Sequence, residues 1–223
     1  MSRSRSLQLL LILACVASSR VARAEVTIQH DPPIVEHKSF DPAHPPEKMS
    51  HLDPGEAAVT ETIFDCFVKS YTQGTEHKSN GGNYESIAKV DTIELTLKLH
   101  VIVWLPNGAP PKLIAHEEGH RRIAEQIYKE RADSAAKAAA AKVNDKEFRT
   151  SAANFARSDK ALEAKLNEAQ NHLCDDYLAQ TGGVAGRVGD LYDQITNHGT
   201  KRQPAEDQAI TEAFERYNKD QKK

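Results

Sequence analysis

The sequence predicts an α+β domain, because strand-like alternation in its first half gives way to helical periodicity in its second half. The clearest alternation spans residues 91–105. Beyond it no proline occurs between Pro111 and Pro204, and Gly119 is the only glycine before Gly182, which favours helix. We therefore expect a small antiparallel sheet followed by a long helical hairpin.

Composition and charge narrow the class of protein. The mean hydropathy of -0.60 excludes a membrane-embedded body. The net charge of -3, with no basic stripe along the chain, argues against a nucleic-acid partner. Length and composition suit one globular domain, which we place at residues 56–223.

The first 24 residues have the three parts of a secretory signal peptide. MSRSRS is basic, LQLLLILACVA is a short apolar run, and Ala22-Arg23-Ala24 suits a signal peptidase. The apolar run is too short for a stable membrane span, which disfavours a membrane anchor. Processing as a lipoprotein at Cys15 is a further alternative. We expect cleavage near Ala24 and a secreted or periplasmic protein.

Residues 25–55 are rich in proline and histidine and poor in large apolar residues. Such a composition favours extended, solvated chain, so we expect a linker or a strap on the domain surface. Prolines prevent a continuous helix, so the regular spacing of the histidines does not place them on one face. A solvated segment is favoured over an accessory metal site formed by His30, His37, His44 and His51.

The folded domain is expected to begin near Glu56 with the strand-forming sequence AAVTETIFDCFVKSYT, followed by a turn at residues 80–83. The strand at 91–105 alternates strictly, which predicts one face on a core and one face near water. The expected core face consists of Ile93, Leu95, Leu97, Leu99, Val101, Val103 and Leu105.

The helical region is too long for one helix in a compact domain, so it must contain a break. Asn144 and Glu147 have the spacing of a capping box, which predicts that a new helix starts there. The expected helices are 111–142, 145–180 and 204–217, with a glycine-rich loop between the last two.

Two cysteines, Cys66 and Cys174, remain once the signal peptide is removed. In an oxidising compartment an isolated pair favours a disulfide over two free thiols. The bridge would close a very long loop, for which chain entropy predicts a stabilisation of about 4–5 kcal/mol at most. Two buried thiols are the alternative.

The motif HEEGH is the strongest chemical signal in the chain. On a helix, His116 and His120 lie one turn apart on the apolar, core-facing stripe. Two imidazoles so placed can bind one tetrahedral Zn²⁺ at about 2.0–2.1 Å. Glu117 lies about 100° around the helix, so it can reach a metal-bound water as general base without joining the ligands. Gly119 costs about 0.5–1 kcal/mol relative to alanine inside a helix, which indicates a close approach there.

An ordinary amphipathic helix is the alternative interpretation of the same motif. The two histidines would then be core residues with satisfied hydrogen bonds. The neighbouring glutamates would form i,i+4 ion pairs, Glu117 with Arg121 and Glu118 with Arg122. The position of the motif on a buried stripe, directly after an alternating strand in a secreted chain, favours the zinc site.

Several further segments make the chain resemble a bacterial family of secreted zinc-dependent proteases, known as a domain of unknown function. These segments are HEEGHRRIAE, the cysteine-bearing FDCFV and HLCDDY, and YDQITNHG before a glutamine-containing stretch near the C-terminus. Their order and spacing agree from about residue 56 to residue 217. The sequence departs from the family pattern just before the motif, where PNGAPPKLIA lacks a tryptophan. The resemblance implies a zinc-dependent protease.

A catalytic zinc needs a third protein ligand and one open position. The extended metzincin signature does not supply that ligand, because it needs glycine and histidine where this chain has Ile123 and Gln126. We expect His198 to be the third ligand. The family resemblance is tight around it, and it follows a glycine-rich turn that could fold back over the helix. The alternatives are Asp193, His172, Glu168 and Glu163.

Two residues of YDQITNHG are candidates for supporting roles. The phenol of Tyr192 could stabilise a developing oxyanion, and the carboxylate of Asp193 could orient a ligand histidine. Capping of the loop is the alternative for both residues.

Together these observations predict a zincin-like fold and a secreted zinc metallopeptidase. Zn²⁺ held by His116, His120 and His198 would polarise a peptide carbonyl. Glu117 would act as general base on metal-bound water. If residues 91–105 offer an exposed sheet edge, an extended peptide or protein substrate could add to it as a strand. The alternatives are a non-catalytic zinc-binding or interaction module and a zinc amidase acting on cell-wall peptides.

Overall fold

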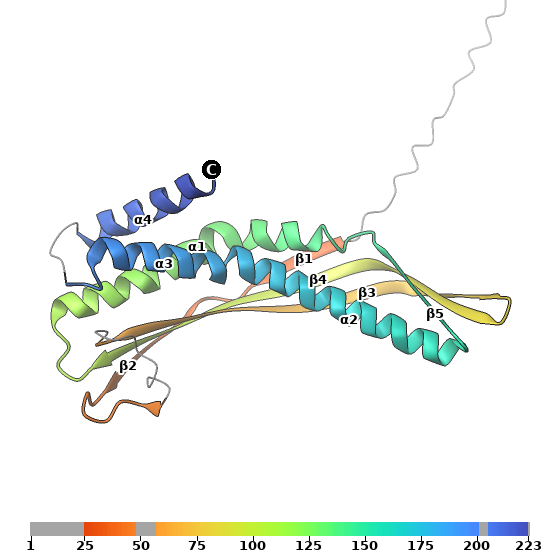
Figure 1. Cartoon of the computed structure of the whole chain (residues 1–223), viewed down its shortest axis with the longest axis horizontal. Coiled ribbons are helices and arrows are strands. Elements are labelled where there is room, and N and C mark those ends of the chain that lie inside the picture. Colours follow the sequence, from red (N-terminus) through yellow and green to blue (C-terminus); the bar gives the residue numbers. More distant parts are fainter. Residues whose placement is uncertain (1–24, 48–56, 201–204, 223) are drawn as a thin grey trace, which may run out of the picture.

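A mixed sheet covered on one face by helices forms the protein (Figure 1). The computed structural model describes residues 25–47, 57–200 and 205–222. The strands are β1 (Glu25–His30), β2 (Ile34–Phe40), β3 (Val59–Asn80), β4 (Asn83–Pro106) and β5 (Glu147–Ala152). The helices are α1 (Pro111–Ala140), α2 (Phe155–Gln180), α3 (Gly182–Thr196) and α4 (Glu206–Asp220). The expected α+β class is confirmed.

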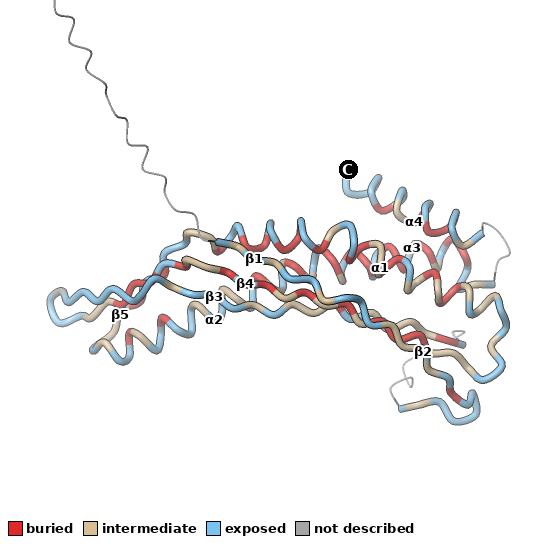
Figure 2. Tube along the Cα trace, turned by 180° about the vertical axis from the view of Figure 1, so that it is seen from behind, coloured by how far each residue is buried: buried red, intermediate tan, exposed pale blue. Residues whose placement is uncertain are grey.

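The alternating stretch at 91–105 is the second half of β4. Its two faces are as expected over residues 93–101, whereas Ile102, expected on the water-facing side, is buried. Ile93, Leu97 and Val101 are fully buried, whereas Glu94 is exposed and Lys98 is half-buried. The buried side faces α1 and α2, which contact β4, and α3 and α4 add further residues to the same core. Seen from behind, the buried turns of α1 lie against the strands (Figure 2).

All other strands pair with β4. β3 runs antiparallel along nearly its whole length, while β5, β1 and β2 follow one another along the opposite edge. Because β1 and β2 pair in parallel, the sheet is mixed, and the expected antiparallel sheet is wrong. Residues 91–105 pair with β3 on one side and with β1 and β2 on the other. The hypothesis that this segment offers an edge to a peptide is therefore wrong.

The proline-rich segment is extended, as expected, but residues 25–40 are strands of the sheet and not a linker. Their apolar side chains explain the difference, because Val26, Ile28 and Val35 pack against the core. Pro32 and Pro33 lie between the two strands, where no ladder hydrogen bond is lost.

The first predicted helix is confirmed to within two residues, but the second one starts later than expected. A turn at 141–145 follows α1. Residues 147–152 then form β5, which pairs with the first half of β4. Phe148 and Thr150 alternate as buried residues with exposed neighbours, which is a strand pattern. The N-cap of α2 is Asn154, whose side chain accepts a hydrogen bond from the Arg157 amide. The capping box at Asn144 is therefore wrong.

The glycine-rich stretch after α2 is also a helix rather than a loop. α3 begins at Gly182 immediately after α2 ends, and it packs against α1 and α4. Val184, Val188 and Tyr192 are buried on one stripe, and this apolar periodicity outweighs the helix cost of the glycines. The last helix, α4, agrees with the expectation near its ends, although Pro204 lies outside the described residues.

Cys66 of β3 and Cys174 of α2 form the expected disulfide, which fastens the long helix to the sheet. No helix in the described ranges combines the length and apolarity that a membrane crossing needs. The expected signal peptide, with Cys15 and Ala24, lies outside the described residues.

Candidate metal centre

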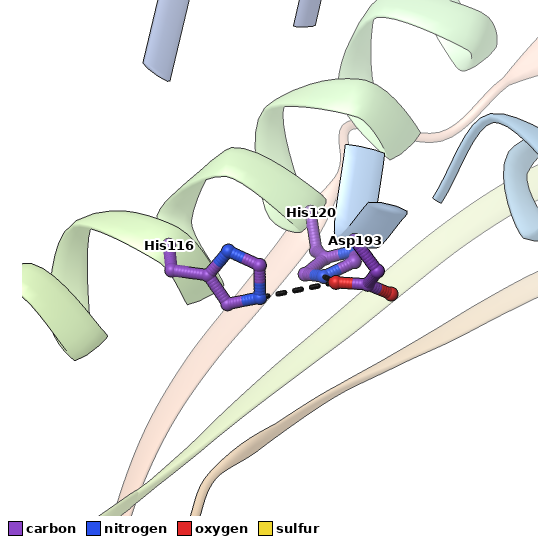
Figure 3. A group of neighbouring side chains, drawn as sticks. All are labelled: His116, His120 and Asp193. Carbon is purple, nitrogen blue, oxygen red and sulfur yellow. Dashed lines mark hydrogen bonds and ion pairs between the residues drawn. The ribbon is translucent and has the colours of Figure 1, made fainter. Parts of the chain in front are cut away.

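Two histidines of α1 and one aspartate of α3 point at a common centre (Figure 3). The Nε2 atoms of His116 and His120 lie 3.1 Å and 2.9 Å from Oδ1 of Asp193. One ligand atom from each residue lies within 4.8 Å of the others, so the group could hold a metal ion. α1 supplies the histidine pair one turn apart, and α3 packs across it to bring the carboxylate.

The donor set suits zinc. Two imidazoles and one carboxylate are among the ligand sets that catalytic zinc sites use. Donor atoms of a tetrahedral ion at about 2.0–2.1 Å lie roughly 3.4 Å apart. The two separations between a histidine nitrogen and the Asp193 oxygen, 3.1 Å and 2.9 Å, are close to that value. Without an ion, the same contacts serve as hydrogen bonds from the imidazoles to the carboxylate. The group provides three ligands, which leaves one tetrahedral position for another molecule.

Thr196 fixes the orientation of the buried ligand His116. Its hydroxyl donates to the Tyr192 carbonyl at 2.8 Å, and its oxygen lies 3.4 Å from Nδ1 of His116. Because the hydroxyl proton is already engaged, we assign the proton of that contact to Nδ1, and Thr196 accepts it. When a metal is bound, Nε2 of the neutral imidazole would then keep its lone pair directed at the ion.

Glu117 is outside the ligand group but lines the same cavity. Its side chain is 4% exposed, and Oε2 accepts a hydrogen bond of 2.8 Å from the hydroxyl of Thr60 on β3. Burial raises the pKa of Glu117 above the usual carboxyl value, and the positive charge of His120 and the Thr60 hydrogen bond counteract this only in part. A carboxylate with a raised pKa is a stronger proton acceptor, as a general base requires.

The pKa of Asp193 is shifted in the opposite direction from that of Glu117. Burial alone would raise the pKa of this carboxyl, but hydrogen bonds from His116 and His120 outweigh that effect and lower it well below the usual range. Asp193 is therefore ionised at neutral pH, the state that a metal ligand needs.

Gly119 allows Tyr192 to lie beside the histidines, which confirms the expected close approach. A Cβ at position 119 would lie 2.5 Å from Cζ of Tyr192. The Tyr192 ring stacks on His116 at 5.1 Å with an interplanar angle of 10°, and meets His120 edge-on at 5.1 Å. The ring is fully buried, its hydroxyl faces Gly119, and it is not part of the cavity lining. The oxyanion role expected for Tyr192 stays a prediction that this buried position does not favour, and the ring packs against both histidines.

His198 lies at the rim of the site rather than in the ligand group. Its Nδ1 is 3.9 Å from Oδ1 of Asp193, and its side chain is 55% exposed. The expectation that His198 completes the group is not met, because α3 ends at Thr196 with Asp193 one turn inside the helix and closer to the histidines. The turn that carries His198 still packs on the site, since a Cβ on Gly199 would lie 2.9 Å from Cβ of His116.

The other ligand candidates lie elsewhere. His172 is largely exposed on α2, beside Glu168 and Asp175, and Glu163 is also exposed on α2. Each described histidine of the proline-rich segment pairs with a different carboxylate, so these histidines form no accessory site; His51 is not described. Those pairs are His30 with Asp133, His37 with Glu118, and His44 with Asp41.

The ion pairs expected of an ordinary amphipathic helix are absent from the described residues. Arg121 pairs with Glu118 and Glu125 instead of Glu117, and Arg122 pairs with Asp207 of α4. Glu117 is thus free of any arginine partner in this part of the chain and faces the cavity. The alternative interpretation of the motif therefore loses its two predicted glutamate–arginine pairs, although its satisfied histidines are compatible with the contacts to Asp193 and Thr196.

A cavity of about 550 Å³ opens onto the centre. Its wall includes His116, Glu117, His120 and Asp193 together with Thr60 of β3 and the turn at 198–200. The cavity gives a ligand of several atoms access to both the donor group and Glu117. Thr60 and Thr196 were not predicted from the sequence, because only the tertiary packing of β3 and α3 on α1 gives them roles.

Comparison of the chain with protein-family models, with curated proteins and with solved structures found no match. The functional assignment consequently depends on the geometry of the site.

Proposed function

We propose that the protein is a secreted zinc-dependent peptidase with a zincin-like active-site helix. The observation that carries this proposal is the convergence of His116, His120 and Asp193 beside the buried carboxylate of Glu117. The cavity that opens in front of them supports it. The disulfide between Cys66 and Cys174 is compatible with an extracellular location.

Zinc held by His116, His120 and Asp193 would supply Lewis acidity toward a peptide carbonyl and toward a water molecule. Glu117 accepts a proton from that water as its oxygen attacks the carbonyl carbon. The C–N bond then breaks, and Glu117 returns the proton to the leaving amine. Thr60 holds the carboxylate in place through its 2.8 Å hydrogen bond.

An extended substrate would lie along β3. β3 pairs with β4 on one side and with no described strand on the other, and Ala58, Val59 and Thr60 line the cavity at its N-terminal end. A strand with one unpaired edge can accept a peptide through main-chain hydrogen bonds. We therefore place the extended peptide substrate at the edge of β3 and no longer at the edge of β4.

Glu117→Gln tests the proposed chemistry. The variant keeps the donor group and should bind zinc with unchanged stoichiometry, but it cannot accept the proton. We expect hydrolysis in a broad peptide screen, including cell-wall peptides, to fall by about 10²–10⁴-fold. Glu118→Gln, at a residue whose carboxylate pairs with His37 and Arg121 and lies outside the donor group, is the matched control and should stay active. Full activity of Glu117→Gln would exclude Glu117 as the base.

A non-catalytic, structural zinc site is the second candidate, because His198 lies close enough to the group to be a fourth ligand after a side-chain movement. Zinc affinity of His198→Ala separates the two functions. A structural site should lose much of its affinity, whereas the peptidase should retain it. A native protein that binds zinc and hydrolyses none of the peptides would support the structural site.

A further inference from the structure

A second cavity of about 250 Å³ lies directly beside the metal centre. Thr60, His120 and Asp193 line both this cavity and the first one, so the two cavities are adjacent. It extends between β3, α1 and α3. A substrate whose reacting carbonyl lies at the centre would therefore have a side chain next to this space.

The walls of the second cavity favour a long, unbranched side chain. Ile123 and Ala124 of α1 are 1% exposed and provide an apolar floor. On the α3 side the wall consists of small residues, and a Cβ added at Gly186 would meet no atom within 4 Å. Such a slot can take the methylene stem of a side chain, which needs no hydrogen-bond partner.

The charge of the cavity wall determines whether the bound substrate side chain should be cationic or anionic. Asp190 of α3 lies in the lining and is exposed. Within the described ranges no hydrogen bond or ion pair engages its carboxylate, and no lysine or arginine lines the cavity. His120 and Asp193 are engaged with each other and with the centre. Asp190 is therefore the carboxylate that can receive a cationic group at this position.

We infer that the second cavity is a specificity pocket for a lysine or arginine next to the bond that is cleaved. The stem lies on Ile123 and Ala124, and the ammonium or guanidinium group pairs with Asp190. This inference rests on the proposed function, since a substrate whose reacting carbonyl lay at the metal centre would place its neighbouring side chain beside the pocket.

Binding of hydroxamates to the zinc-loaded protein tests the pocket without relying on turnover. Acetohydroxamate has no side chain and reports on the metal centre alone. The N-acetyl hydroxamates of lysine, norleucine and glutamate add a cationic, a neutral and an anionic side chain. We expect the lysine compound to bind about fivefold more tightly than the norleucine compound, since a partly exposed ion pair corresponds to roughly that ratio.

Three variants and a control separate the effect of charge from the effect of shape. Asp190→Asn should equalise the lysine and norleucine affinities, and Asp190→Lys should favour glutamate over lysine. Gly186→Leu fills the slot and should weaken the lysine and norleucine compounds about tenfold or more, leaving acetohydroxamate unchanged. Glu215→Gln makes the same charge change as Asp190→Asn on the exposed side of α4 and should change none of the affinities.

The outcomes distinguish this inference from the proposed function. If acetohydroxamate binds but the side chains make no difference, or if Asp190→Asn leaves the lysine preference intact, the specificity pocket is overturned and the metal site stands. If neither zinc nor acetohydroxamate binds, both proposals are overturned together.

Discussion

The contact between Gly119 and Tyr192 shows how one missing side chain shapes the candidate metal site. Gly119→Ala would force the Tyr192 ring away from His116, because its Cβ would lie 2.5 Å from Cζ. We expect a loss of about 1–3 kcal/mol in the free energy of unfolding, together with weaker zinc binding. Urea denaturation and a zinc titration measure the two effects.

The matched control for Gly119→Ala is Gly186→Ala, the same substitution on a helix where the added Cβ has open space. This variant should be more stable than the native protein by about 0.5–1 kcal/mol. Equal effects of the two substitutions would contradict the importance of the close approach at Gly119.

Tyr192→Phe distinguishes a packing role from a catalytic one. The Tyr192 hydroxyl is buried and finds no hydrogen-bond partner in the described part of the chain, and burial raises its pKa well above the usual phenol value. Removing an unsatisfied hydroxyl should leave stability and zinc affinity nearly unchanged or slightly improved. Hydrolysis should also persist, whereas loss of an oxyanion donor would reduce kcat by about 10²–10³-fold.

The sequence alone was sufficient to predict the part of the candidate site that α1 supplies, but not the part that α3 supplies. His116, Glu117 and His120 lie within one helix, so their mutual placement follows from helical periodicity alone. Asp193 depends on how α3 crosses α1, which no local pattern determines. It was therefore one of several alternatives, and the histidine preference of zinc favoured His198 instead.

Among the elements, the contact of α2 with the β3–β4 hairpin predicts a pH effect. Asp159 of α2 accepts hydrogen bonds from Ser86 on β4 and from His77 on β3. These two contacts lower the pKa of Asp159. A lowered folded-state pKa contributes stability that is present above about pH 4 and is lost as the pH falls through the folded value.

Asp159→Asn removes that ionisation. The stability advantage of the native protein over this variant should narrow as the pH falls from 5 to 3, which urea denaturation of the metal-free proteins would measure. Ser86→Ala removes the stronger of the two hydrogen bonds and should show part of the same loss. Parallel stability curves for native protein and Asp159→Asn would rule out the coupling.

The elements that the sequence mispredicts share one physical cause. β5 lies in a stretch whose composition suits a helix, and it becomes a strand because β4 has an open edge beside residues 84–89. α3 is helical despite four glycines because its apolar stripe is buried between α1 and α4. In both places tertiary contacts override local propensity, whereas β4 and α1 carry strong periodic signals of their own.

For the whole molecule, zinc should act as a stabilising ligand. The donors come from α1 and α3, so binding ties two helices that the unfolded chain does not hold together. At a free zinc concentration one hundred times the dissociation constant, linkage predicts about 2.7 kcal/mol. For a chain of this size that corresponds to a rise in Tm of roughly 5–10 °C.

A thermal scan with zinc and with a chelator measures this shift. Asp193→Ala should abolish most of it, and His172→Ala, which removes an exposed histidine of α2, should keep it. An equal zinc shift in both variants would place the metal elsewhere in the protein.

The position of β4 at the centre of the sheet has a consequence for association between copies. β1 and β2 cover, end to end, the edge of β4 that runs from Thr92 to Pro106. A chain that lost residues 25–40 would present this edge with its hydrogen-bonding groups unpaired, next to a strongly apolar face. Such a truncated chain would pair with its own copies and aggregate, so the N-terminal strands protect the solubility of the protein as well as completing its sheet.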